Sequence, residues 1–308
     1  MRSPRTWLTL SLPLLCAAAI AACGSSNNSS SSSSSSSSGS TSSSAPSPAA
    51  DPAVEKLVPA SIKSKGSITI AADATYAPDE FIGSDGHTVV GMDADLVKAL
   101  AAVMGLKANV VNATFDTIIP GLASGKYDMG ASSMTDNKER EKVVNFVTYF
   151  QAGESFYTKA QGGTDVSSIS DICGKTVSVE KGTTEAADAA TQGKKCKAEG
   201  KPGVTELVFP DQNGANLAVS SGKAQLGFAD TPVAAYQVKL SHGVFKLVGA
   251  PYANGPYGFP FAKSSKLDIA VLAALKVLMK NGTYDTILKK WGLTAQAISN
   301  PKINGAVF

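Results

Sequence analysis

Short apolar runs rich in β-branched residues alternate with helical patterns along the chain from Gly66 onward. Strands are predicted at residues 67–71, 108–111, 127–132, 175–179, 206–209 and 225–229, and helices at 93–104, 116–124, 185–192, 215–221 and from Thr231 onward. In the segment 93–104, Leu96 and Leu100 fall on one helical face, and Gly105 is a typical helix end. This alternation predicts parallel sheets covered by helices, an α/β fold in which ligands bind beyond the carboxyl ends of the strands.

A short sequence repeat links two of the predicted helix-to-strand turns. The segment from Ser124 to Gly130 (SGKYDMG) matches the segment from Ser221 to Gly227 (SGKAQLG). In both copies an apolar helix ends, a glycine turns the chain and a strand begins. The repeat indicates two similar lobes that each direct one strand end at a shared cleft; the alternative is a common helix-to-strand turn used twice.

The first 22 residues have the features of a secretory signal peptide. Arg2 and Arg5 precede an apolar run, residues 7–22, that is short for a membrane span. The run ends in Ile-Ala-Ala-Cys, which resembles the bacterial lipobox, where the peptide is cut just before a lipid-modified cysteine. We therefore predict that residues 1–22 are removed and that Cys23 carries acyl chains, which hold a protein on a bilayer. An uncleaved anchor helix is the alternative.

The segment that follows is predicted to be a disordered tether, residues 23–64. It is mostly serine through residue 50, and no charged residue occurs between Arg5 and Asp51. Such a segment has too little apolar surface to offset the entropy of ordering. We expect the folded part to lie outside the cytoplasmic membrane, on its outer face, and to be held near it.

The overall composition limits the classes of partner. Hydrophobic residues make up 43% and charged residues 17% of the chain, so most of it is expected to fold as a globule. The net charge of +3 offers no electrostatic footprint for nucleic acid. The two histidines and four cysteines show no recognisable zinc spacing. No metal and no cofactor are predicted.

Cysteine usage agrees with export. Cys16 leaves with the signal peptide and Cys23 is lipidated, so Cys173 and Cys196 remain. Outside the cell such a pair usually forms a disulfide, which would contribute about 3 kcal/mol for a loop of this size. Two free buried thiols are the alternative.

Polar groups of complementary charge follow the predicted strands. Arg140 can bind a carboxylate with two parallel hydrogen bonds. Gly182-Thr183-Thr184 opens a helix, and free N–H groups at a helix start attract anions. Asp230 ends another strand and can accept hydrogen bonds from an ammonium group. Together they describe a site for an α-amino acid, although Arg140 could form an ordinary surface ion pair and the others could simply cap helices.

Aromatic and acidic side chains lie near the same strand ends. Asp73, Tyr76 and Phe81 follow the first strand, Phe115 follows the second, and Glu180 follows a later one. Aromatic walls exclude water and strengthen polar contacts inside a pocket. The alternatives are core packing for the rings and a solvated loop charge for Glu180.

These motifs, in this order, resemble the polar amino-acid-binding proteins of bacterial ABC importers, which are the solute-binding proteins of family 3. The resemblance covers about residues 65–293 and rests on GSITI at 66–70, DATYAP at 73–78, VGMDADL at 90–96, IPGL at 119–122, residues 133–140, GTT at 182–184, ADTP at 229–232, NGTYD at 281–285 and KW at 290–291. It implies a two-lobed, type II periplasmic-binding-protein-like fold with two hinge crossings. Lobe 1 would hold residues 65–158 and 252–308, and lobe 2 residues 159–251.

The resemblance also implies roles in binding the ligand backbone. Arg140 would pair with the α-carboxylate, with help from Thr135 and from the helix start at Thr183-Thr184. Ser133 and Asp230 would take the α-ammonium group. The hinges would lie near residues 157–159 and 253–255.

Other positions would contact the ligand side chain. Tyr76 and Phe115 would flank the ligand, and Asp73 and Glu180 would sense its side chain. Many members have Pro-Phe-Glu-Phe where this chain has Pro-Asp-Glu-Phe at 78–81, and Asp-Asn at 136–137 replaces the usual apolar-Thr pair. The acidic residues favour a cationic or neutral polar side chain.

We therefore expect a monomeric lipoprotein that captures a polar L-amino acid between its lobes, closes around it and delivers it to an ABC permease. Contacts to both lobes would favour the closed form, because only that form assembles the whole site. The alternatives are a tethered amino-acid sensor for a membrane receptor or kinase, and a cyclohexadienyl-dehydratase-like enzyme with Glu180 or Asp73 as the acid. We expect no enzymatic activity.

Overall fold

The computed structural model describes residues 48–308. The predicted signal peptide, the lipidation site at Cys23 and most of the tether lie outside the described residues. The predicted end of the tether at residue 64 was wrong, because Pro52–Glu55 and Ala60–Lys65 are helices and the apolar side chains of Val54 and Val58 are buried in the core of the first lobe. In the described part of the chain, no helix combines the length and the apolar character needed to cross a membrane. Residues 48–308 also contain no group of three or more His, Cys, Asp or Glu side chains arranged to hold a metal ion.

A parallel sheet with the strand order β5-β1-β6 forms the centre of the first lobe. Strand β1 (Ser67–Ala72) pairs with β5 (Lys107–Asn112) along its full length and with β6 (Met129–Gly130). Strands β1 and β5 confirm the strands predicted at residues 67–71 and 108–111. The predicted strand at 127–132 is shorter, because the backbone leaves the sheet after Gly130 and turns with a positive φ of 47° at Ser133.

A second sheet has the order β11-β7-β10-β8-β9. Its short strands β8 (Thr176–Glu180), β9 (Thr205–Phe209) and β10 (Leu226–Asp230) are parallel to one another, as predicted. Two long strands, β7 (Val144–Lys159) and β11 (Phe245–Ala262), join this sheet as an antiparallel pair.

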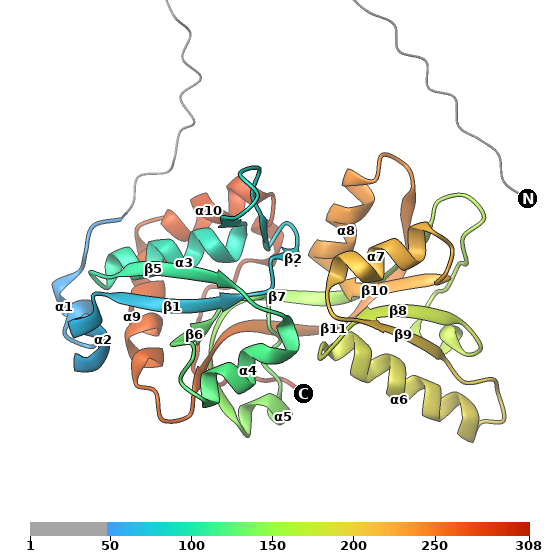
Figure 1. Ribbon diagram of the computed structural model, residues 1–308, viewed down its shortest axis with the longest axis horizontal. Coiled ribbons are helices and arrows are strands. Elements are labelled where there is room, and N and C mark those ends of the chain that lie inside the picture. The colour runs from blue at the N-terminus through green and yellow to red at the C-terminus, as the bar shows by residue number, and fades with distance from the viewer. Residues whose placement is uncertain (1–47) are drawn as a thin grey trace, which may run out of the picture. The chain divides into compact units, whose positions relative to one another are not determined.

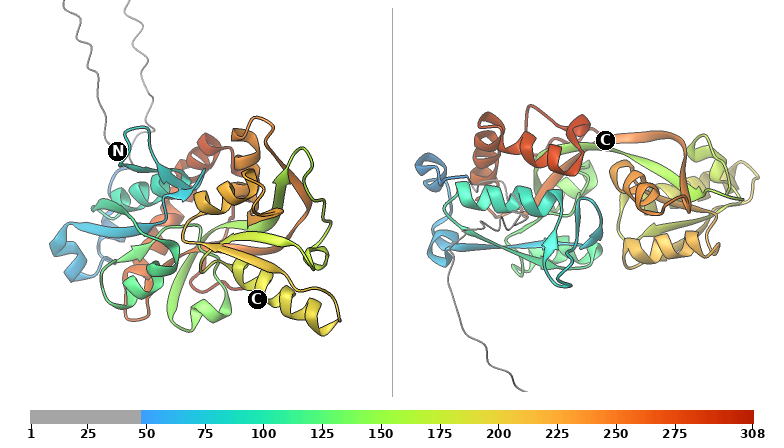
Figure 2. Two further views of the ribbon diagram at one scale, coloured as in Figure 1. Left: turned by 45° about the vertical axis from the view of Figure 1, so that its right-hand side comes forward. Right: turned by 90° about the horizontal axis from the view of Figure 1, so that it is seen from above.

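The pair β7 and β11 crosses from one lobe to the other (Figures 1 and 2). Strand β7 already pairs with β10 from Glu154 to Tyr157, and the register between β11 and β7 shifts between Val248 and Gly255. In these views the chain passes between the lobes along β7 and along β11. The predicted two-lobed α/β fold is confirmed, and the exact lobe boundaries stay a prediction.

A small antiparallel sheet, order β2-β3-β4, lies at the edge of the first lobe next to the second. It contains β2 (Thr75–Tyr76), β3 (Glu80–Ile82) and β4 (Val89–Val90). The peptide bond between Ala77 and Pro78 is cis and lies in the turn between β2 and β3. The sheet carries Tyr76 towards the second lobe.

Helices cover both sheets. In the first lobe these are α1 (Pro52–Glu55), α2 (Ala60–Lys65), α3 (Met92–Val103), α4 (Phe115–Ala123), α5 (Lys138–Glu141), α9 (Leu267–Lys280), α10 (Thr283–Trp291) and a 3₁₀ turn at Thr294–Gln296; in the second they are a 3₁₀ turn at Ile169–Ile172, α6 (Thr184–Ala198), α7 (Gln212–Ser220) and α8 (Thr231–Leu240). The predicted helices are found, and α6 continues past the expected end at residue 192. Helix α8 begins at Thr231, as predicted, and Asp230 immediately precedes its first turn.

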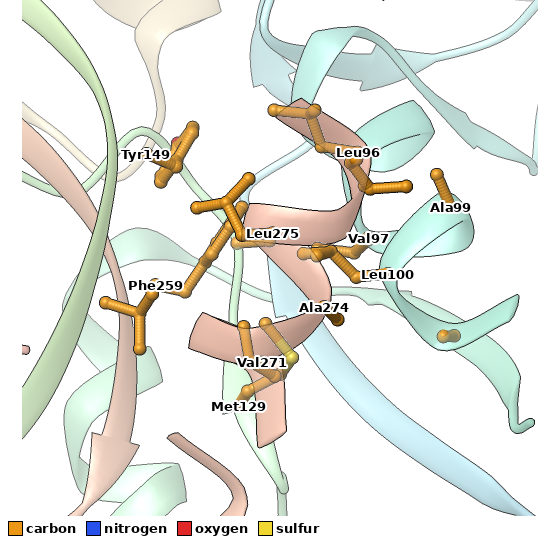
Figure 3. Close-up of a cluster of buried hydrophobic side chains, with 14 of the residues drawn as sticks. Leu96, Val97, Ala99, Leu100, Met129, Tyr149, Phe259, Val271, Ala274 and Leu275 are labelled. Atoms are coloured by element: carbon orange, nitrogen blue, oxygen red, sulfur yellow. The ribbon is translucent and has the colours of Figure 1, made fainter. Parts of the chain in front are cut away.

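The core of the first lobe lies between its sheet and helices α3 and α9. Leu96 and Leu100 of α3 lie beside Leu275 of α9, and all three are buried (Figure 3). Tyr149 stacks on Phe259 with ring centroids 3.9 Å apart. Truncating one such leucine to alanine typically costs about 2–5 kcal/mol, so this core holds the sheet rigidly under the strand ends.

The repeated sequence folds in the same way in both lobes. Gly125 follows α4 with φ of 75°, and Gly222 follows α7 with φ of 77°. A side chain at this backbone angle is strained, which explains the glycine at the end of each helix. Strands β6 and β10 follow the two turns.

The predicted disulfide is confirmed. Cys173 and Cys196 are bonded, with their Cα atoms 5.6 Å apart. The bond ties the 3₁₀ turn at Ile169–Ile172 to helix α6 in the second lobe.

Candidate functional site

A narrow pocket with a cavity volume of about 10 Å³ lies between the two lobes. It is lined by Asp73, Tyr76, Phe115, Ser132, Ser133, Thr135, Arg140, Glu180, Thr183, Thr184, Glu185 and Asp230. Every predicted ligand-binding residue except Phe81 is in this set. Ser132 and Glu185 were not predicted.

Strand ends from both lobes meet at this pocket. Asp73 follows β1, and Ser132 lies two residues after β6, in the first lobe. Glu180 ends β8 and Asp230 ends β10 in the second lobe. Carboxyl ends of parallel strands share one edge of a sheet, which is why residues far apart in the sequence converge here.

Arg140 is held by groups from both lobes. Its Nη1 donates to the Thr135 carbonyl oxygen at 2.7 Å, and its Nη2 donates to the Gly182 carbonyl oxygen at 3.0 Å. Its Cζ lies 5.4 Å from the centroid of the Phe115 ring, a cation–π contact. Burial lowers the pKa of Arg140, while the carboxyls of Glu185 and Asp230 act in the opposite direction. Arginine stays charged in proteins, so the pocket has a fixed cation.

Asp73 and Glu180 form an acidic pair across the lobes. Asp73 accepts hydrogen bonds from Thr75 Oγ1 at 2.7 Å and from the Phe115 N–H at 3.0 Å. Glu180 is 2% exposed, and its Oε1 has no hydrogen-bond partner. Burial, followed by the charge of Asp73, raises the pKa of Glu180 to about 10. Burial also raises the pKa of Asp73. A cation between the two carboxyls would allow both to ionise.

Asp230 contacts the first lobe through Tyr76. The Tyr76 hydroxyl donates to Asp230 Oδ2 at 3.0 Å, and the Asp230 N–H donates to the same hydroxyl at 3.0 Å. Burial, followed by the charges of Glu185 and Glu154, raises the pKa of Asp230 well above its ordinary value. The predicted ammonium acceptor therefore lies in an environment that favours a cationic partner.

Glu185 is a site residue that the sequence analysis missed. It lies in the first turn of α6, is 1% exposed, and its Oε1 has no partner. Burial raises the pKa of Glu185 to about 7. The sequence did contain a signal for Glu185. It directly follows Gly182-Thr183-Thr184, and side chains in the first turn of a helix lie close to any ligand bound at the helix start.

Ser132 was also missed, although it precedes the predicted Ser133. Its Oγ accepts from the Asp73 N–H and donates to Glu80 Oε1, each at 2.9 Å. It therefore connects the acidic pair of the pocket to a carboxyl that lies behind it.

Most hydroxyl groups of the pocket donate their hydrogen bond to another group of the protein. Those of Tyr76, Ser132, Ser133, Thr183 and Thr184 donate to Asp230, Glu80, Asp79, the Glu180 carbonyl and Glu185, respectively. A hydroxyl has one proton, so each of these oxygens accepts hydrogen bonds from a ligand while any carboxyl partner it has is ionised. Together with four carboxyls they line the pocket with acceptors, and Arg140 is the one cationic side chain among the lining residues.

Phe81 lies elsewhere. Its ring packs edge-on against Trp291, with centroids 5.8 Å apart, and it is not among the residues that line the pocket. Strand alternation in β3 explains this, because neighbouring side chains point to opposite faces and the preceding Glu80 points inward. Phe81 is therefore not part of the proposed ligand site.

Additional contacts join the lobes at the rim of the pocket. The Gln212 N–H donates to Thr75 Oγ1 at 3.1 Å, and Lys181 Nζ lies 2.8 Å from Asp116 Oδ2. With the Arg140 and Tyr76 contacts, these bonds describe a closed arrangement of the lobes.

Comparisons with known proteins agree with this geometry. Residues 68–294 match the family described as bacterial extracellular solute-binding proteins, family 3. The arginine-binding protein ArgT of Corynebacterium glutamicum is 34% identical over 254 residues, covering 82% of this chain and 83% of that protein. An ancestral arginine-binding protein bound to arginine has a similar structure, with a TM-score of 0.67 and 34% identity over 73% of this chain and 98% of that chain. The ancestral amino acid-binding protein AncCDT-1, a precursor of cyclohexadienyl dehydratase, has a TM-score of 0.65 and 34% identity, covering 75% of this chain and 97% of that chain.

Proposed function

Because this chain belongs to the bacterial extracellular solute-binding proteins of family 3, we propose that it captures a cationic L-amino acid, arginine before lysine, for an ABC importer. The family has a two-lobed type II fold, and its members bind solutes outside the cytoplasm. The choice of a cationic ligand depends on the charges in the pocket.

The observation that carries this choice is the excess of carboxyls over cations. Asp73, Glu180, Glu185 and Asp230 line the pocket together with the single cation Arg140. Burying several carboxyls without cations is costly, and the raised pKa of Glu180 reflects that cost. An amino acid with a second positive charge would offset it. The relative in C. glutamicum is an arginine-binding protein, which supports the same choice.

Each end of such a ligand has a matching group in the pocket. Arg140 and the start of α6 would bind the α-carboxylate. Asp230 and Ser133 would accept from the α-ammonium group. Asp73 and Glu180, from opposite lobes, would bind the side-chain guanidinium, for which paired oxygens are a favourable geometry.

Tyr76, Phe115 and Thr135 would complete the site as walls around the bound ligand. Groups from both lobes would contact the ligand, so binding would favour the closed form. A membrane permease would receive the ligand from that form, while a separate ATPase supplies the energy.

A thermal-shift and calorimetric screen of the twenty amino acids tests the proposal, because a ligand that binds only the native state raises the melting temperature. We expect L-arginine to give the largest shift, with L-lysine next and glutamate giving none. A shift with neutral amino acids alone would contradict the cationic assignment. No shift with any amino acid would contradict the capture function.

We also propose that the mature protein is a monomer tethered to the outer face of the cytoplasmic membrane through lipid on Cys23 and the serine-rich segment that follows it to residue 50. The Ile-Ala-Ala-Cys sequence and the serine-rich segment support this. Cys23→Ala should move the protein from the membrane fraction to the medium. Retention of the variant in washed membranes would argue against the lipid anchor.

A dehydratase-like activity is the second candidate, because Glu180 is a pocket carboxyl whose pKa is raised to about 10, as a general acid at neutral pH requires. The precursor relationship of AncCDT-1 adds to this candidate. We propose that the chain is not an enzyme, since Glu180 faces a second acid that suits a guanidinium. Incubation with prephenate and arogenate should give no product, and turnover that is lost in Glu180→Gln would reverse this assignment.

A further inference from the structure

A cluster of buried carboxyls lies behind the pocket in the first lobe. Asp79, Glu80 and Asp93 are each 0% exposed, and none of them lines the pocket. Burial and the charges of the other members raise the pKa of Asp79 and of Glu80 well above their ordinary values. Burying several carboxyls together raises the free energy of the folded state, so the contacts of this cluster call for an explanation beyond packing.

All three carboxyls bind one residue, Ser133. Asp93 Oδ2 accepts from the Ser133 N–H at 2.8 Å. The Ser133 hydroxyl donates to Asp79 Oδ2 at 3.1 Å and approaches Glu80 Oε2 at 3.3 Å. Ser133 has a φ of 47°, an unfavourable backbone angle for a residue with a side chain. The cluster therefore holds both the backbone and the hydroxyl of Ser133 in place.

The direction of the hydroxyl determines what Ser133 offers to a ligand. A free serine can donate to a carboxylate or accept from an ammonium group. While Asp79 or Glu80 is ionised, the serine proton is directed into the carboxyl cluster, and the oxygen presents lone pairs alone to the pocket. The Ser133 hydroxyl lies closer to Asp79 than to Glu80, and Asp79 does not line the pocket, so its effect on a ligand is expected to pass through Ser133.

We infer that Asp79 is a positioning residue that makes Ser133 an obligate acceptor for the α-ammonium group of the ligand. This inference depends on the proposed function. It assigns the cluster a role in selecting ligands with a protonated amine over analogues without one. A purely structural cluster would instead anchor the segment around Ser133 and affect all ligands equally.

Asp79→Asn separates these two roles. The amide has nearly the shape of the carboxyl, but its NH₂ group can donate to Ser133 and turn the serine proton towards the pocket. The probes are L-arginine and 5-guanidinopentanoate, which is arginine without its α-amino group. By calorimetry we expect a loss of about tenfold or more in affinity for L-arginine, and a change of less than about twofold for the analogue.

A double-mutant cycle with Ser133→Ala gives an independent measurement. It uses L-arginine alone, so it does not depend on how tightly the analogue binds. If Asp79 acts through the Ser133 hydroxyl, Asp79→Asn should not weaken L-arginine binding further in the Ser133→Ala background. Asp268→Asn is the matched control, because Asp268 is also a buried carboxylate of the first lobe, 5% exposed, but accepts from Asn145 Nδ2 at 3.1 Å and not from Ser133. Asp79→Leu, which removes the acceptor without adding a donor, should show a smaller loss of the same kind and serves if Asp79→Asn fails to fold.

The outcomes also separate this inference from the proposed function. Equal losses for both probes, or full additivity with Ser133→Ala, would overturn the role of Asp79 and leave the proposed function intact. Wild-type protein that binds neither L-arginine nor L-lysine would overturn the proposed function itself.

Discussion

The hydroxyl oxygen of Tyr76 lies 3.0 Å from Asp230 Oδ2 and 3.0 Å from the Asp230 backbone nitrogen. Tyr76 belongs to the small sheet of the first lobe, and Asp230 ends strand β10 of the second. Two hydrogen bonds between one phenol and one aspartate therefore join the lobes at the pocket. The residue proposed to hold the ligand ammonium also helps to hold the lobes together.

Tyr76→Phe is expected to favour the open form when no ligand is bound. An ordinary hydrogen bond contributes about 0.5–1.5 kcal/mol, so loss of the Tyr76 hydroxyl should raise the ratio of open to closed molecules several-fold. Small-angle X-ray scattering should show a larger radius of gyration for the unliganded variant, and L-arginine should restore the wild-type value. Tyr127→Phe is the control, because Tyr127 does not line the pocket. An unchanged scattering curve would contradict a role of the Tyr76–Asp230 contact in holding the lobes closed.

Arg140→Ala is expected to reduce L-arginine affinity by more than 100-fold. The variant removes the group proposed to bind the α-carboxylate, and truncating one partner of a buried charge pair costs about 2–5 kcal/mol or more. Calorimetry provides the measurement. Lys138→Ala, an exposed cation on the same helix α5, should bind as the wild type does. Affinity within threefold of wild type for Arg140→Ala would remove Arg140 from the site.

Asp73→Asn and Glu180→Gln are expected to shift selectivity from cationic to neutral side chains. Each removes one carboxyl of the pair proposed to bind the guanidinium but keeps its size. The ratio of arginine to glutamine affinity should fall at least tenfold in either variant, as measured by competition calorimetry. If both affinities fall in parallel, these two residues do not sense the side chain.

Binding of arginine is expected to release protons at neutral pH, one of them from Glu180. Without ligand, Glu180 holds its proton because burial and Asp73 raise its pKa to about 10. A guanidinium beside it lowers that pKa, so the complex carries fewer protons than the free protein. Affinity should therefore rise with pH up to about the unliganded pKa of Glu180.

Calorimetry at pH 7 in phosphate and in Tris, which differ in ionisation enthalpy, measures this release. Glu180→Gln should reduce it. Uptake of a proton, or equal binding enthalpies in the two buffers for the wild type, would contradict the assignment.

Cys173→Ser is expected to destabilise the second lobe without changing ligand affinity. Removing a bond that closes a loop of this size costs about 3 kcal/mol, and neither cysteine lines the pocket. The melting temperature should fall by several degrees, while the dissociation constant for L-arginine stays within about twofold. A tenfold change in affinity would show instead that the disulfide acts on the site.

Local patterns along the sequence were sufficient to predict most of the lobe framework. The apolar periods predicted β1, β5 and β8 to β10 and the helices α3, α4, α7 and α8 to within a few residues. The long strands β7 and β11 were not predicted. Their antiparallel pairing joins segments about a hundred residues apart, and no local period marks which segments will pair.

The identity of the pocket residues was also largely present in the sequence, because polar residues after buried strands converge at one edge of a parallel sheet. This is why Arg140, Glu180 and Asp230 were predicted together. Phe81 was predicted as a ligand-binding residue but does not line the pocket, and Glu185 was missed, because the direction of a side chain depends on how its element packs.

What only the tertiary structure decided is the chemistry that each group offers. Ser133 and Asp79 are 54 positions apart, yet their contact sets whether the serine donates or accepts. The Tyr76–Asp230 contact spans 154 positions and links the lobes. Proton positions and raised pKa values arise from burial and from neighbours brought close by folding, and these depend on distances in space that a linear order of residues does not specify.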